Sequence, residues 1–169
     1  MSFFKKIFGG HSEKRKPNSG AMPTRALNLQ FSPTPENAEK LAQQFVGAVM
    51  KNEKKELDYS IDTMDFVDNF LQRFSDEGLA VNDFAETIFV AGAYVGQVMV
   101  QKNNGVWIRQ EEANLPNGVT MMPIVVRLPN GNVCDPIAKA FKRFHNGEVD
   151  NIEYFYHVFT SDALQGGQE

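Results

Sequence analysis

One stretch decides how this chain folds: Ile88-Phe89-Val90-Ala91-Gly92-Ala93-Tyr94-Val95-Gly96-Gln97-Val98-Met99-Val100. Its residues are apolar around every face of a helix, and Gln97 carries the only amide side chain among them. A helix on a protein surface keeps one polar face, so a helix that is apolar all round has to be enclosed by other elements. The stretch therefore predicts that a helix over residues 81–103 lies at the centre of the fold.

Two amphipathic helices are predicted ahead of this central helix. The first starts at Thr34-Pro35, a typical cap and first-turn pair, and loses its pattern in the polar run 51–56. The second starts after Ser60 or Asp62 and ends at Gly78. The apolar positions that recur at helical spacing in these two segments are Leu41, Phe45, Val46, Val49, Met50, Met64, Phe66, Val67, Phe70, Leu71 and Phe74.

The pattern changes from helical to extended after Gly105. Residues 106–108 and 121–128 are rich in β-forming residues, and Asn130-Gly131 is a typical hairpin turn. Pro123 has to lie at an edge or near the start of its strand, because proline donates no ladder hydrogen bond. These segments predict a small antiparallel meander of three strands.

Two more helices are predicted after the meander. Asp135-Pro136 is a good helix start, and Asp150 with Glu153 has the spacing of a capping arrangement for the last helix. The expected fold class is therefore α+β, with about five helices packed on a three-stranded antiparallel meander and the 81–103 helix in the centre.

Charge and composition divide the chain into a body and tails. Residues 1–16 hold five Lys and Arg against one Glu, a net charge of +4, so the rest of the chain carries −8 of the total −4. Glycine, proline, serine and charge dominate residues 9–34 and cannot form a core. We expect a basic flexible tail and linker over 1–33, one α+β domain over 34–164, and a disordered tail over 165–169.

The cysteine content, the apolar segments and the charge of the chain bear on its cellular compartment and its partners. Cys134 is the only cysteine, so no intramolecular disulfide can form, which fits a cytoplasmic protein. The apolar stretch 88–100 is shorter than the roughly 20 residues that span a bilayer. The start of the chain, residues 1–8, combines apolar and basic residues that would support weak membrane contact. An acidic body argues against nucleic-acid binding.

Gly92 and Gly96 lie on one face of the central helix and allow another backbone to approach closely. They would form a dimer seam or an intramolecular contact with the first or second helix. We favour the intramolecular contact, because the dimer meaning of this glycine spacing belongs mainly to membranes.

Four residues are candidates for a binding pocket: Tyr59, Tyr94, Gln97 and Trp107. Aromatic rings with one amide are reasonable pocket lining. The alternative for Gln97 is a structural hydrogen bond to a backbone group of the meander, because a buried amide without a partner costs about 1–3 kcal/mol. We favour the structural alternative. Glutamine is also a poor general acid or base, and no catalytic residue is assigned.

A basic cluster is expected on the helix that starts at residue 135, formed by Lys139, Lys142, Arg143 and His145. It would bind an acidic partner or phosphate, or be a solvated face with cations near the helix C-terminus, which we favour. Cys134 is expected to be a small buried residue rather than a nucleophile. The histidines show no metal-ligand spacing, so the sequence predicts no metal site and no cofactor. A run of four aspartates is expected to be a solvated helix face: Asp58, Asp62, Asp65 and Asp68.

A resemblance to one family covers about residues 57–156. The motif Gly92-Ala93-Tyr94-Val95-Gly96-Gln97-Val98, followed by Gly105-Val106-Trp107, resembles a family of uncharacterised bacterial proteins with a Gly-Ala-Tyr-x-Gly-x-Val helix and a Gly-x-Trp strand. The start Leu57-Asp58-Tyr59-Ser60 and the segment 142–147 are also similar. Gln97 stands where the family pattern has Glu. The resemblance implies a fold and no activity.

The best function hypothesis is a non-enzymatic bacterial protein-binding module. An acidic body without an assembled catalytic set suits an immunity or inhibitor protein that covers a basic partner. The first alternative is a small-ligand-binding protein or hydrolase with a pocket at Tyr94, Gln97 and Trp107. The second is a peripheral membrane protein that attaches through residues 1–8. The oligomeric state is left open.

Overall fold

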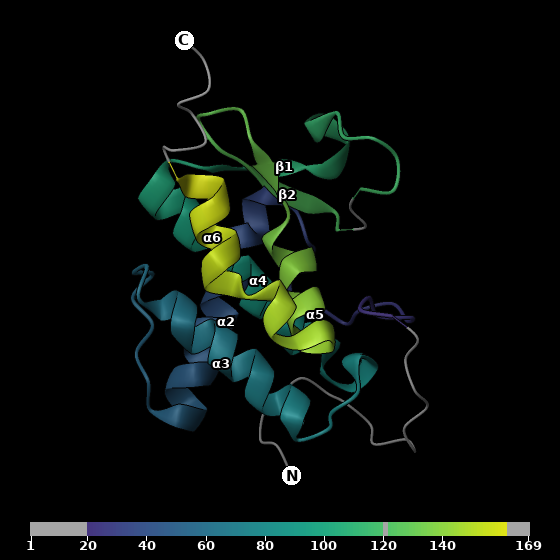
Figure 1. Cartoon of the computed structure of the whole chain (residues 1–169), viewed down its shortest axis with the longest axis vertical. Helices are drawn as coiled ribbons and strands as arrows, with labels where there is room; N and C mark the ends of the chain where they lie inside the picture. Colours follow the sequence, from purple (N-terminus) through teal and green to yellow (C-terminus); the bar gives the residue numbers. More distant parts are fainter. Residues whose placement is uncertain (1–19, 120–121, 162–169) are drawn as a thin grey trace.

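The computed structural model describes residues 20–119 and 122–161 (Figure 1). Five α-helices and a three-stranded antiparallel sheet occupy this part of the chain, which confirms the predicted α+β fold class. The elements, with three short 3-10 helices named η, are η1 (Pro35–Asn37), α2 (Ala38–Glu53), α3 (Thr63–Asp76), α4 (Val81–Asn103), β1 (Val106–Arg109), η2 (Gln110–Ala113), β2 (Ile124–Arg127), β3 (Val133–Cys134), α5 (Pro136–Asn146), η3 (Gly147–Asp150) and α6 (Ile152–Thr160).

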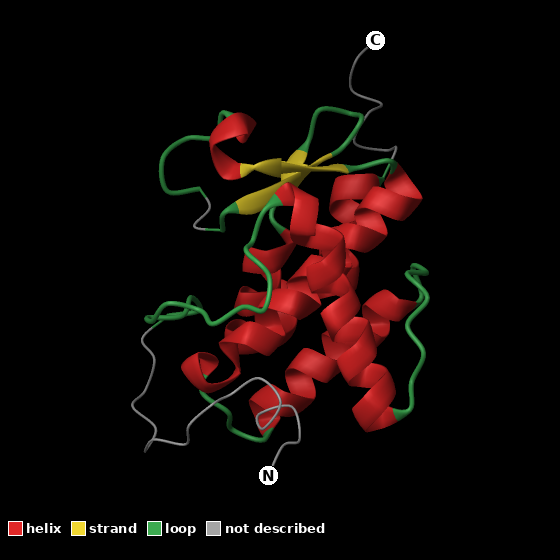
Figure 2. Cartoon of the chain, turned by 180° about the vertical axis from the view of Figure 1, so that it is seen from behind, coloured by secondary structure: helices red, strands yellow, loops and turns green. Residues whose placement is uncertain are grey.

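The central helix of the fold is α4. Every residue from Phe84 to Met99 is buried, which matches the apolar pattern around all its faces. Helices α2 and α5 pack along it, and α3, α6, β1 and β2 complete its enclosure. Figure 2 shows the helices gathered below the small sheet. Both ends of α4 agree with the predicted range 81–103.

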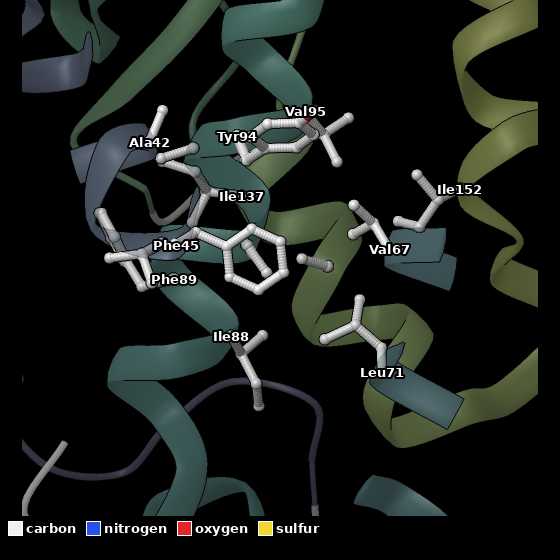
Figure 3. Packing of buried hydrophobic residues seen from close by; sticks show 14 of the residues in the cluster. Ala42, Phe45, Val67, Leu71, Ile88, Phe89, Tyr94, Val95, Ile137 and Ile152 are labelled. Atoms are coloured by element: carbon white, nitrogen blue, oxygen red, sulfur yellow. The ribbon is translucent and has the colours of Figure 1, made fainter. Parts of the chain in front are cut away.

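Most of the buried side chains form one continuous core (Figure 3). Phe45 of α2, Leu71 of α3, Ile137 of α5 and Ile152 of α6 converge on α4. Aromatic rings join the helices, and the Phe45 ring meets Phe70 edge-on with 5.1 Å between centroids. Edge-on pairs of this kind are favoured by the charge distribution of aromatic rings.

The sheet has the strand order β1-β2-β3 with antiparallel pairs, such as Trp107 opposite Val126. Pro123 directly precedes β2, as predicted, and its carbonyl accepts a hydrogen bond from the Gln110 N–H at 3.0 Å. The turn between β2 and β3 contains Gly131 at φ +88°, a conformation that favours glycine. One sheet face packs on the helices, and a small separate cluster around Val125 covers the other.

The segment of residues 20–33, here called the strap, corrects one prediction. The sequence indicated a linker outside the core, but Met22, Leu27, Leu29 and Phe31 are partly buried against it. Leu27, Leu29 and Phe31 alternate with exposed residues at the period of a strand, but the glycine, proline, serine and charge of residues 9–34 favoured a linker. Residues 1–19 and 165–169, for which tails were predicted, lie outside the described residues.

The caps of the last two helices agree with the sequence in one case only. Asp135 caps α5 as predicted, and its carboxylate accepts from the Ala138 N–H at 2.8 Å. Helix α6 is capped by Asn151, which accepts from the Tyr154 N–H at 2.8 Å, and not by the predicted Asp150. Asp150 ends η3 instead, because this extra turn of chain moves the start of α6 by one residue.

The two glycines of α4 make intramolecular contacts, as favoured, but with other elements than expected. A β-carbon on Gly92 would lie 2.5 Å from the Ile137 Cα of α5, and one on Gly96 would lie 2.2 Å from the Trp107 ring of β1. The glycines were expected to face the first or second helix. Both of those helices pack elsewhere on α4, because a helix enclosed on all sides offers each neighbour a different face.

Replacing Gly92 with alanine should destabilise the protein by about 2 kcal/mol, because the new methyl group meets α5 backbone that cannot move aside. Gly47→Ala is the matched control. Gly47 lies inside α2, and a β-carbon added to it would meet nothing within 4 Å, so this change should stabilise the helix by about 0.5–1 kcal/mol. Urea unfolding followed by tryptophan fluorescence measures both. Equal effects of the two substitutions would contradict the packing account.

Asp135 should make the stability depend on pH. Burial raises the pKa of this carboxyl to about 6, although the Ala138 N–H and Lys142 favour its charge. A raised folded-state pKa means that the folded protein holds the proton more tightly, so stability falls as pH rises from about 4 to 6. Asp135→Asn keeps an acceptor for the cap and removes the titration. The variant should gain about 1–2 kcal/mol on the parent between pH 4 and 7, measured by urea unfolding at each pH. A difference that is constant with pH would refute this account.

Candidate functional site

Tyr59 and Tyr94, two of the predicted pocket residues, pack on each other. Their rings stack with 4.8 Å between centroids, and Tyr94 is fully buried. The Tyr94 hydroxyl accepts from the Tyr59 N–H at 3.0 Å and lies 2.8 Å from Thr63 Oγ1. Burial raises the pKa of Tyr59 to about 12, so its phenol stays neutral at physiological pH. This pair joins the loop before α3 to the central helix.

Gln97 and Trp107 form the second pair. The Trp107 indole N–H donates to Gln97 Oε1 at 3.0 Å, and the two residues are 6 % and 8 % exposed. The expected partner of Gln97 was a backbone group of the meander, and the observed one is a side chain of its first strand. The indole ring fills the space above Gly96. The four predicted residues therefore divide into two packed pairs.

Arg143 corrects the prediction of a basic, solvated helix face. It is 1 % exposed and holds the Asp68 carboxylate with both prongs of its guanidinium, at Nε–Oδ1 2.7 Å and Nη2–Oδ2 2.8 Å. Hydrogen bonding and the charge of Asp68 raise the pKa of Arg143. Lys139 pairs with Asp150 at 2.7 Å, and Lys142 is exposed. The sequence gives the charged residues of this helix but not whether each side chain points to solvent or to the core. All of them were therefore expected to be solvent-exposed.

Asp68 is likewise buried, in contrast to the solvated run predicted for it. Besides Arg143, it accepts the Ile152 N–H at 2.8 Å. One carboxylate on α3 thus binds α5 through a side chain and α6 through its first backbone amide. Arg143 also reaches Gln72 of α3 and Glu148 of η3. This network fixes the orientation of α3 and decides which of its faces remains exposed.

The exposed face of α3 carries an open groove of about 470 Å³. Its lining residues are Asn69, Gln72, Arg73, Asp76 and Glu77. We call it the α3 groove. Arg73 pairs with Glu53 of α2, and its guanidinium lies 4.8 Å from the centre of the Phe74 ring. Its positive charge is therefore partly balanced by the protein. Asp76 and Glu77 are exposed, and Asp76 Oδ1 accepts a hydrogen bond from Gln72 Nε2 at 2.8 Å.

The α3 groove lies in the most acidic part of the chain. Residues 56–86 contain nine Asp and Glu and a single basic residue, Arg73. Asp68 and Glu86 are buried in ion pairs with Arg143 and Arg25, and the others are exposed or half-buried. The remaining acidic residues of this region are Glu56, Asp58, Asp62, Asp65, Asp76, Glu77 and Asp83. Like charges gathered in one region raise the local concentration of cationic groups.

The cysteine and the histidines among the described residues are not grouped as a catalytic or metal-binding set. Burial raises the pKa of the Cys134 thiol, which agrees with a small buried residue rather than a nucleophile. His145 is exposed, and His157 lies 3.7 Å from Glu153 on the surface of α6. Within residues 20–119 and 122–161, no group of three or more His, Cys, Asp and Glu could hold a metal ion.

No match to this chain appears among protein-family models, curated proteins or solved structures. The resemblance to a bacterial family therefore stays a prediction. Among the described helices, none combines the length and the apolar character needed to cross a membrane.

The sequence did not identify the α3 groove. The sequence predicts an acidic helix face from Asp58 to Asp68, but the groove residues lie in the turns that follow. The density of acidic residues over 56–86 was the available signal. This density does not locate the groove by itself, because the sequence does not show that Asp68 points into the core and Asp76 toward solvent.

Removing the Asp68 carboxylate should destabilise the protein by about 3–5 kcal/mol, because Asp68→Ala leaves Arg143 buried without its counter-charge. The control is Asp65→Ala, one turn earlier on the exposed face of the same helix, which should cost less than about 1 kcal/mol. Urea unfolding measures both. A cost for Asp68→Ala as small as that of the control would show that the buried pair is not holding α3.

Proposed function

We propose that this chain is a non-catalytic bacterial protein-binding module that uses the α3 groove to bind a basic segment of another protein. A specific form of this proposal is an immunity or inhibitor protein that covers the basic site of its partner. The observation that carries the proposal is the open, acidic groove on a helix whose inner face is rigidly fixed.

The charge distribution supports a basic partner. Two carboxylates, Asp76 and Glu77, line the groove, and Asp65 lies on the same exposed side of α3. Complementary charges speed up encounter and reject partners of the wrong sign, even where each exposed pair contributes little free energy. The amides of the groove help to hold its carboxylates in place. Asn69 Nδ2 donates to Asp65 Oδ1 at 3.1 Å, and Gln72 Nε2 donates to Asp76 Oδ1 at 2.8 Å.

Rigidity supports a binding role as well. The Asp68–Arg143 pair and the edge-on contact between Phe45 and Phe70 hold the inner face of α3. A surface that is already ordered loses less conformational entropy when a partner binds.

The pocket proposed at Tyr94, Gln97 and Trp107 lacks this kind of support. The Tyr94 hydroxyl, Gln97 Oε1 and the Trp107 indole N–H bind one another or their neighbours, and Tyr94 is fully buried. The Tyr59 hydroxyl is buried without a hydrogen-bond partner among the described residues, but its ring is stacked on Tyr94. Residues 1–8, which would carry membrane contact, lie outside the described residues. Peripheral attachment stays a prediction.

A fluorescein-labelled octalysine peptide tests the proposed groove. Its binding to the full chain, followed by fluorescence anisotropy in low salt, should weaken about fivefold to tenfold in Asp76→Asn/Glu77→Gln. The control Glu39→Gln/Glu111→Gln makes the same charge change at exposed positions outside the groove and should alter affinity less than about twofold. Equal losses in the two variants would show general attraction to an acidic protein. An absence of binding both to the parent and to a variant that lacks the positive charges of residues 14–16 would reject the proposal.

A further inference from the structure

The strap is clamped to the start of α4. Arg25 makes a two-pronged ion pair with Glu86, with Nη1–Oε1 and Nη2–Oε2 distances of 2.6 and 2.8 Å. Thr24 exchanges two hydrogen bonds with the Asn82 side chain, at 2.9 and 2.7 Å. Glu86 is only 4 % exposed, so this clamp is screened by salt less than a surface ion pair. The strap therefore has a defined place on the folded body.

The clamp lies close in the chain to the α3 groove. Asn82 is the second residue of α4, and Glu77 of the groove precedes it by five positions. Figure 1 shows the end of α3 and the start of α4 in the same lower part of the molecule, opposite the sheet. The described chain begins at Gly20, four residues before Thr24, and four extended residues reach about 14 Å.

The length of chain before the clamp is sufficient to reach the whole groove. Residues 1–16, here called the arm, span on the order of 50 Å when extended. Helix α3 has 14 residues and is about 21 Å long. A tether of this kind holds two groups at an effective concentration near the millimolar range, roughly that of short flexible linkers.

The arm is also the part of the chain whose charge complements the groove. The arm contains one acidic residue, Glu13, and five basic residues: Lys5, Lys6, Lys14, Arg15 and Lys16. By contrast, the segment 56–86, which contains the groove residues, has seven acidic residues outside the buried ion pairs and one basic residue, Arg73. Opposite charges held at a millimolar effective concentration associate even when the free segments would bind only weakly.

We infer that the arm binds the α3 groove of its own chain and competes there with the basic partner. This inference rests on the proposed function for its consequence, since the arm then sets the affinity that a partner observes. If the arm fills about nine-tenths of the grooves, a partner binds about tenfold more weakly than to a vacant groove. Removing the positive charge of the arm, for example by modification of its lysines, would open the site.

The first test needs no partner. The side-chain amide signals of Asn69 and Gln72 report on the groove in NMR spectra of the labelled full chain. Lys14→Gln/Arg15→Gln/Lys16→Gln should shift both signals, because the arm leaves the groove. The control Lys40→Gln/Lys102→Gln/Arg127→Gln removes three exposed body cations and should leave them in place. Signals that are identical in the parent and the arm variant would overturn the inference.

The second test uses the octalysine peptide. The arm variant should bind it about tenfold more tightly than the parent, and the body-cation control should match the parent. Arg25→Ala keeps every arm charge but releases the tether, so it should give part of this gain. Equal affinity of the parent and the arm variant would overturn the inference and leave the proposed function standing. If no variant binds the peptide, the proposed function fails, and the NMR test still decides whether the arm occupies the groove.

Discussion

The need to enclose α4 on every side is the constraint on which this structure depends. Sixteen consecutive residues of one helix, from Phe84 to Met99, are hidden from water. A single neighbouring helix covers only one stripe of such a surface, so α2, α5 and the sheet each cover a different side of α4. The glycines make this enclosure possible, because Gly92 admits the backbone of α5 and Gly96 admits the ring of Trp107.

The enclosure also explains where the polar groups of the interior lie. Tyr94 and Gln97 project from α4, and each meets a partner that another element supplies. Asp68 and Arg143 follow the same rule between helices that pack on α4. A buried charge without a partner costs far more than a buried pair. The interior polar contacts therefore select which elements can be neighbours, and one result is that α3 presents a single defined face to solvent.

Much of the fold could be predicted from the sequence, and the candidate site could not. The ends of α4, the meander and the start of α5 follow from local signals: uniform apolarity, an Asn-Gly turn and an Asp-Pro cap. The strap could not be placed from the sequence, although Leu27, Leu29 and Phe31 alternate as in a strand, because its overall composition is that of a linker. Its anchor is also long-range, since Arg25 binds Glu86, 61 positions away. The burial of Arg143 could not be predicted for a related reason, because its partner Asp68 is 75 positions away in the chain. The groove depends on which side of α3 is exposed, and long-range contacts decide that.

The clamp between Arg25 and Glu86 has a consequence for the order of assembly during synthesis. The strap leaves the ribosome before any other described segment, yet its binding site does not exist until α4 has emerged. Helix α4 in turn stays uncovered along its Gly92 face until α5 has been made. Helix α4, with sixteen consecutive residues that are buried in the folded protein, is thus exposed while residues 104–146 are being added. During this interval the nascent chain is most open to aggregation and to chaperones.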